Sequence, residues 1–207
     1  MKINDKDLDL KKYENMYDTF DPGHNRNHME AVRGFAVELA KKYAPEQVDL
    51  AYIAATLHDI GLSVARENHE GHGATIILED PYLKSILTPG QLEVVVETVR
   101  EHRASSGKPE SVVAKIVSDA DKGGATLTTA SAIQRSYDYG KAKYEGLSDD
   151  EQFERAMSHL AEKFGEKGTG TRVYFPETKE KMDKVFAPII EAVKTKDISK
   201  IKELMKA

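Results

Sequence analysis

Apolar residues recur at intervals of three and four along most of the chain, and this spacing constrains the fold more than any other feature. One such stripe consists of Val32, Phe35, Ala36, Leu39 and Tyr43. Either Asn25 or Asn27 can cap the helix that this stripe predicts. Alternating patterns typical of strands are almost absent, so the sequence predicts an all-α fold.

The same spacing predicts further helices along the chain. We expect helices over about 45–60, 70–79, 89–102, 111–120, 125–144, 148–164 and 176–193, and then a short final helix. Ser148 and Glu151 form a capping box at the start of one of them. Glycines follow residue 164, and a short hairpin or ordered loop is expected near 168–175. We predict a single domain over 1–207, with a core at about 20–145 and a helical C-terminal extension at about 146–207.

Composition narrows the class of protein. Hydrophobic residues make up 40% and charged residues 31% of the chain, as in an ordinary globular protein. The net charge of -5 argues against a nucleic-acid binder. Residues 1–10 contain no apolar stretch of signal-peptide type, and no apolar run is long enough for a membrane span. We therefore expect a cytoplasmic protein, and we leave a homo-oligomer open.

Several predicted apolar stripes end in a histidine or an aspartate. These residues are His28, His58, Asp59, His102 and Asp121. His58 and Asp59 follow the most apolar segment, residues 50–57, so their side chains should enter or border the core. A buried carboxylate needs a partner, which can be a hydrogen-bonding core residue or a cation.

The chain has no cysteine, so any metal ligands must be histidines and carboxylates. Six of the seven histidines fall between His24 and His102. If the histidines and aspartates converge, their nitrogen and oxygen donors suit a divalent transition metal: iron, manganese, cobalt, nickel or zinc.

The order of these residues resembles a known signature. His28, then His58-Asp59, then Asp121 is similar to the H…HD…D pattern of the HD superfamily of metal-dependent phosphohydrolases. The resemblance covers roughly residues 20–140 and implies an HD-domain helical bundle. It also implies that these four residues hold one metal ion.

Two further segments resemble HD members that bind two metal ions. His69 lies four residues before Gly73-Ala74, and His102 ends the next matching segment. The resemblance implies that Asp59 bridges to a second ion held by His69 and His102, so that one or two ions are bound. His72 is an alternative to His69, which better keeps the family's spacing.

The resemblance implies a phosphohydrolase that acts on a phosphomonoester or nucleotide through a metal-activated water. In this interpretation His58 and Asp59 act in catalysis as metal ligands, and Lys122 joins them. Lys122 and Arg103 are predicted to bind a small anionic, phosphate-bearing substrate. Arg66 and Arg100 are weaker candidates for the same role.

Two alternatives remain open. Some HD proteins use two iron ions for an oxygen-dependent oxidation, and the six-ligand pattern suits that chemistry equally well. The chain can also be a non-catalytic binding protein with a structural metal, which would leave no open coordination position. The sequence departs from the cyclic-dinucleotide phosphodiesterases because Leu62 follows Gly61 where that branch has lysine.

Overall fold

A computed structural model describes residues 2–21, 23–103, 107–123, 128–164 and 172–206. Over these ranges the chain is almost wholly helical, so the predicted all-α fold is confirmed. The chain divides into two compact units, Met1–Ala125 and Thr126–Ala207. No helix in the described part is long and apolar enough to cross a bilayer.

The first unit contains a small hairpin, three 3-10 helices and seven α-helices. In chain order they are β1 (Lys2–Ile3), β2 (Lys6–Asp7), α1 (Lys11–Glu14), η1 (Asn15–Thr19), α2 (Arg26–Tyr43), η2 (Pro45–Gln47), α3 (Val48–Leu57), η3 (Ile60–Ser63), α4 (His69–Glu79), α5 (Pro81–Ile86), α6 (Pro89–Glu101) and α7 (Val112–Gly123). The two strands pair antiparallel, with Lys2 opposite Asp7 and Ile3 opposite Lys6.

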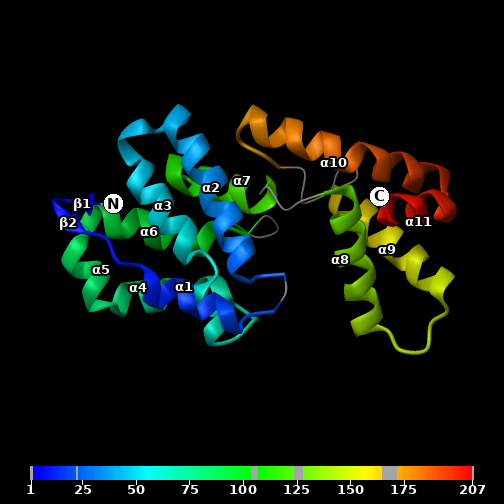
Figure 1. The fold of residues 1–207 in the computed structure, drawn as a ribbon, viewed down its shortest axis with the longest axis horizontal. Helices are drawn as coiled ribbons and strands as arrows, with labels where there is room; N and C mark the ends of the chain where they lie inside the picture. The colour runs from blue at the N-terminus through cyan, green and yellow to red at the C-terminus, as the bar shows by residue number, and fades with distance from the viewer. Residues whose placement is uncertain (1, 22, 104–106, 124–127, 165–171, 207) are drawn as a thin grey trace. The chain divides into compact units, whose positions relative to one another are not determined.

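Helix α3 forms the centre of the first unit, and α2, α6 and α7 pack around it (Figure 1). Its apolar sequence explains this position, since Ile53, Ala54 and Leu57 are fully buried and a helix of this kind needs neighbours on most sides. Helix α4 packs against α6 and against η3. Helix α4 is thus held beside the turn that follows α3.

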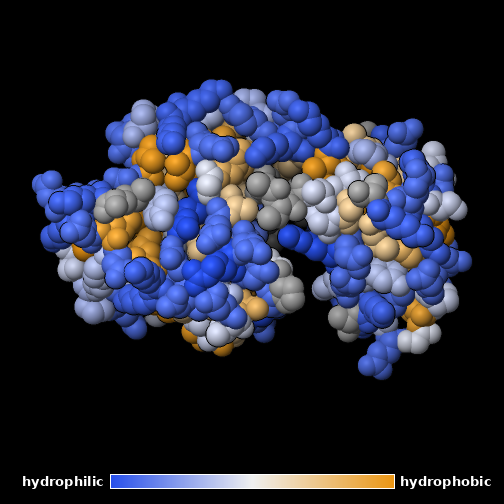
Figure 2. Space-filling view, in the orientation of Figure 1, coloured by the Kyte–Doolittle hydropathy of each residue, from blue (hydrophilic) through white to orange (hydrophobic). Residues whose placement is uncertain are grey.

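Polar side chains cover most of the face shown in Figure 2, and apolar residues appear there in small groups. Within the described ranges, the large apolar side chains that are exposed are Val64, Leu78 and Tyr139. Such scattered residues are ordinary for a protein surface and need no partner to explain them.

The described residues of the second unit form four helices. They are α8 (Thr129–Lys143), α9 (Asp149–Phe164), α10 (Pro176–Thr195) and α11 (Ile198–Lys206). Their core includes Ile133, Phe153, Phe186, Ile189 and Ile201.

Several sequence predictions can be compared with these elements. Asn25 accepts a hydrogen bond from the backbone N–H of His28, so it is the cap of α2, and the Ser148–Glu151 capping box is also present. The sequence predicted one helix over 45–60, whereas α3 ends at Leu57 and the chain turns at Asp59. The sequence analysis did not predict α1, α5 or the hairpin, which are too short to show a periodic pattern.

The predicted core at 20–145 differs from the first unit because α8 packs with α9, α10 and α11. One contact that joins α8 to α9 is between Tyr137 and Phe153, whose ring centroids lie 4.6 Å apart. The single-domain organisation remains a prediction. Of the hairpin or loop expected at 168–175, residues 168–171 lie outside the described residues, and residues 172–175 form no strand.

Candidate metal centre

Helix α2 delivers His28 from its first turn. The Asn25 side chain caps the helix by accepting the backbone N–H of His28 at 3.1 Å. Met29 and Val32 follow on the buried side and fix the rotation of the helix against α3 and α7. The His28 side chain is 9% exposed and its Nε2 points to the end of α3.

The end of α3 supplies the second and third side chains. His58 retains helical backbone angles, but Asp59 has φ -108° and ψ 6°, outside the helical region. This region is sparsely populated and is common for active-site residues. Both side chains are buried, His58 at 0% and Asp59 at 3% exposure.

A first cluster consists of His28, His58 and Asp121. The Nε2 atoms of His28 and His58 lie 3.3 Å apart, and Asp121 Oδ1 lies 3.3 Å from His28 Nε2. Asp59 Oδ2 lies 3.0 Å from His58 Nε2 and 3.6 Å from His28 Nε2. Four donors from α2, α3 and α7 and the turn after α3 thus surround one point.

A second cluster consists of Asp59, His69 and His102. Asp59 Oδ1 lies 3.3 Å from His69 Nε2 and 3.4 Å from His102 Nε2. The two Nε2 atoms are 3.3 Å apart. Asp59 therefore lies between the clusters and presents one carboxylate oxygen to each.

Backbone carbonyls orient three of the four imidazoles. The Nδ1 atoms of His58, His69 and His102 lie 2.8, 3.1 and 2.7 Å from the carbonyl oxygens of Ala55, Arg66 and Val99. A carbonyl only accepts, so each Nδ1 carries a hydrogen and each Nε2 can present a lone pair to the cluster. Metal-binding histidines characteristically have this arrangement.

The charges of the cluster reinforce one another. Burial disfavours a charged His58, but the Asp59 and Asp121 carboxylates outweigh burial and raise the pKa of His58 to about 9. Burial alone would raise the pKa of Asp59, yet the adjacent His58, His102 and His69 hold it well below its usual range. The pKa of Asp121 is lowered in the same way, against burial, chiefly by His28. A field that stabilises positive charge on the imidazoles also favours a cation between them.

The donor set fits a divalent transition metal. Asp59 Oδ2 is buried and faces the Nε2 atoms of His58 and His28 at 3.0 and 3.6 Å, so a carboxylate and two imidazoles are placed where they can bind one cation. In both clusters, two imidazole nitrogens face each other at 3.3 Å, so each pair can bind a single cation. Imidazole and carboxylate donors together suit iron, manganese, cobalt, nickel or zinc.

Glu70 is a residue that the sequence analysis missed. Its Oε2 lies 3.3 Å from His69 Nδ1, and its Oε1 accepts a hydrogen bond of 3.1 Å from Arg103 Nη1. The Arg103 side chain is 42% exposed beside His102, so it can reach a ligand. The only sequence signal for Glu70 is its position next to His69.

Tyr17 is the second residue that the sequence analysis missed. It is fully buried and contacts the turn at Asp59. Burial, together with the Asp59 carboxylate, raises the pKa of this phenol well above its usual value, so the hydroxyl keeps its hydrogen. Its neighbours in sequence show no pattern that predicts this contact.

The other predicted site residues differ in environment. The Lys122 side chain is only 6% exposed, and its Nζ lies 3.8 Å from Asp119 Oδ1. The Arg66 side chain is 71% exposed and pairs with Asp21, and Arg100 is exposed. His72 does not belong to either cluster of the described residues.

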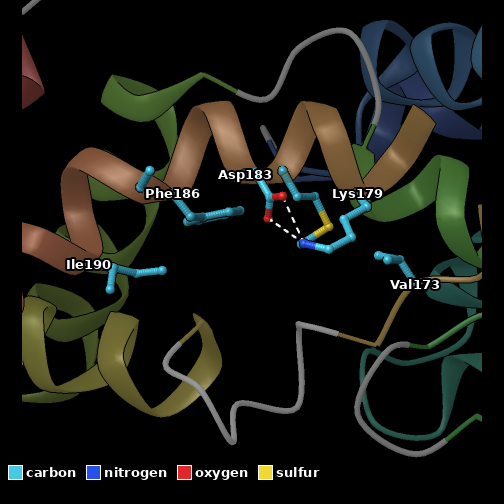
Figure 3. Close-up of a pocket in the computed structure, with 7 residues that line it drawn as sticks. Val173, Lys179, Asp183, Phe186 and Ile190 are labelled. Atoms are coloured by element: carbon cyan, nitrogen blue, oxygen red, sulfur yellow. Dashed lines mark hydrogen bonds and ion pairs between the residues drawn. The ribbon is translucent and has the colours of Figure 1, made fainter. Parts of the chain in front are cut away.

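The second unit has a pocket of its own, of about 180 Å³ (Figure 3). Val173, Phe186 and Ile190 line it, and Lys179 forms an ion pair of 2.7 Å with Asp183 at its edge. No histidine lines this pocket among the described residues, and it has no donors comparable to those of the two clusters.

Comparison with known proteins agrees with the fold and the clusters. Residues 25–123 match the family model described as HD domain, and this segment includes all six residues of the two clusters. This segment is therefore an HD domain, and the resemblance seen in the sequence is confirmed over these residues. No curated protein and no solved structure matches the chain.

Proposed function

We propose that the chain is a metal-dependent phosphohydrolase that acts on a phosphomonoester or a nucleotide. The HD domain implies a function of the metal-dependent hydrolase type. The observation that carries the proposal is the position of Asp59, whose two oxygens face one cluster each, at 3.0 and 3.3 Å from the nearest imidazole nitrogen.

In this proposal His28, His58, Asp59 and Asp121 hold a first ion, and Asp59, His69 and His102 hold a second. A bound divalent cation would lower the pKa of a coordinated water from about 15.7 to about 7. The residues of the chain keep the donors in place, with Asp59 ionised and three histidines fixed by backbone carbonyls.

Arg103 is the residue best suited to bind the substrate. Its guanidinium is partly exposed, lies next to His102 in sequence, and is held by Glu70 through one of its nitrogens. An arginine oriented in this way can bind a phosphate with its remaining N–H groups. Lys122 follows Asp121 in sequence and adds a compact positive charge there. In this proposal it acts in catalysis together with the metal ligands.

The same six residues favour one second candidate, an oxygenase with two iron ions. The hydrolase and the oxygenase require the same two clusters, so the positions of these residues are compatible with both functions. They differ in what is consumed: a hydrolase needs water alone, whereas an oxygenase needs molecular oxygen.

The test combines metal analysis with an anaerobic assay. We expect the purified protein to contain a transition metal and to release phosphate from a panel of phosphomonoesters and nucleotides without oxygen. Two equivalents of iron with oxygen consumption and no phosphate release would overturn hydrolysis in favour of oxidation. If the protein binds metal but leaves no coordination position open to small anions, the metal is structural and the enzyme proposal fails.

A further inference from the structure

Tyr17 connects η1 to the turn that carries Asp59. Its hydroxyl donates a hydrogen bond of 2.9 Å to the carbonyl oxygen of Thr56 and accepts one of 3.2 Å from the backbone N–H of Asp59. A phenol can do both at once. These two contacts join residues 39 and 42 positions apart in the sequence.

The two contacts fall at the point where the chain leaves α3. The last carbonyls of a helix have no partner within it, and Tyr17 satisfies that of Thr56. The backbone N–H of Asp59, three residues further along the chain, donates to the same hydroxyl oxygen. The peptide that precedes the Asp59 side chain is therefore fixed from a different element.

The ring of Tyr17 has little freedom to move. The residue is 0% exposed, and its ring centroid lies 5.2 Å from that of Phe20 and 6.3 Å from that of His58. Because the ring is held in place, the position of its hydroxyl is fixed. The hydrogen bond to this hydroxyl in turn fixes the backbone N–H of Asp59. A shift of this backbone would move both carboxylate oxygens, and so would disturb both clusters together.

From these contacts we infer that Tyr17 is a positioning residue for the metal centre, which holds the Asp59 carboxylate between the two clusters through its backbone. This inference rests on the proposed function, since it assumes that Asp59 binds metal. It predicts that loss of the hydroxyl alone weakens the binding of every ion that Asp59 contacts. A purely structural tyrosine would affect unfolding and leave metal affinity unchanged.

The test uses the full chain and Co²⁺ as the probe. Tyr17→Phe keeps the ring and removes only the hydroxyl. We expect the dissociation constant for Co²⁺ to rise by about 10- to 100-fold, as when other residues behind metal ligands are removed. The visible absorption of bound Co²⁺ should change as well, because the geometry of the Asp59 oxygens changes.

Tyr13→Phe is the matched control. Tyr13 is also a buried tyrosine of the first unit, at 2% exposure on α1, but it lies beside Asp80 and not beside Asp59. Its variant should bind Co²⁺ with the wild-type affinity and spectrum. If Tyr17→Phe also binds Co²⁺ like the wild type, the inference is wrong, while the metal centre itself stands. If the wild type binds no Co²⁺, the proposed function fails first.

A stabilised background guards against a variant that does not fold. Gly34 lies exposed within α2, and a Cβ there would meet no other atom within 4 Å. Gly34→Ala should therefore raise stability without touching the centre. The double variant with Gly34→Ala and Tyr17→Phe is then compared with the single variant Gly34→Ala. Equal Co²⁺ affinity in these two proteins would again overturn the inference.

Discussion

His69 Nε2 and His102 Nε2 lie 3.3 Å apart, although the two residues come from different helices and both Nδ1 atoms contact backbone carbonyls. The pair His28 and His58 repeats this distance in the first cluster. Between the pairs lies Asp59, with one oxygen for each. The two clusters are thus halves of one centre that shares Asp59.

Asp59→Ala should abolish metal binding at both clusters, because it removes the residue that they share. Metal content measured by elemental analysis should fall to near zero, and phosphate release should stop. Helix content measured by circular dichroism should be retained, since Asp59 lies after the end of α3. A variant that keeps its metal would disprove the central assignment.

His159→Ala serves as the control for this experiment. His159 belongs to the second unit, where its ring stacks on Tyr139 with a centroid distance of 5.2 Å. We expect metal content and turnover to stay at wild-type values in this variant.

The sequence predicted five members of the centre because each of them ends or extends an apolar stripe, whereas His69 came from the family resemblance alone. Such a stripe fixes the face of a helix that is buried, so a histidine in register with it must point inward, as His28 and His102 do. The convergence of the stripes on one point came from the family resemblance and not from periodicity. The structure brings all six side chains together, and their role as ligands remains our proposal.

Contacts that depend on single hydrogen bonds between distant segments could not be predicted in this way. Tyr17 reaches Asp59 from a short 3-10 helix, where no periodic stripe exists. The turn at Asp59 was also missed, because an apolar helix pattern continues through Ile60 although the backbone does not. Local pattern thus predicts which face is buried but not where a tertiary contact bends the chain.

Glu70→Gln should selectively weaken the binding of the second ion. Glu70 contacts His69 Nδ1 and Arg103 but no residue of the first cluster in the described structure. Losing its charge should lower the affinity of the second ion by about 10-fold and leave the first unchanged. Calorimetric titration of the metal-free protein resolves the two equivalents. Glu79→Gln, an exposed change on the same helix, is the control. Equal weakening of both ions would show that Glu70 acts on the whole centre.

Arg103→Met should affect the substrate more than the metal. If the guanidinium binds a substrate phosphate, its loss removes a charged hydrogen bond of about 1.5 kcal/mol, which corresponds to about a 10-fold rise in KM. Metal content should not change, because Arg103 is not a member of either cluster. Arg100→Met, at an exposed position on α6, should leave KM unaltered. An unchanged KM in the Arg103 variant would remove this residue from the substrate site.

Gly61→Ala should disrupt the second cluster through the backbone. A Cβ at Gly61 would lie 1.9 Å from the carbonyl oxygen of His69 and 2.4 Å from the amide nitrogen of Gly73, so η3 and α4 must move apart. Overpacking of this kind costs about 1–3 kcal/mol or more. Since His69 is the first residue of α4, the same movement should carry His69 away from Asp59 and weaken the binding of the second ion.

Gly34→Ala gives the opposite expectation at an open position of α2. Its added methyl group meets no neighbour, so the variant should gain about 0.4–1 kcal/mol from the reduced freedom of the unfolded chain. Urea unfolding of the two metal-free variants measures both changes, and calorimetry measures the ions. If Gly61→Ala is as stable as the wild type and binds two equivalents normally, then close contact between η3 and α4 is not what brings His69 to Asp59.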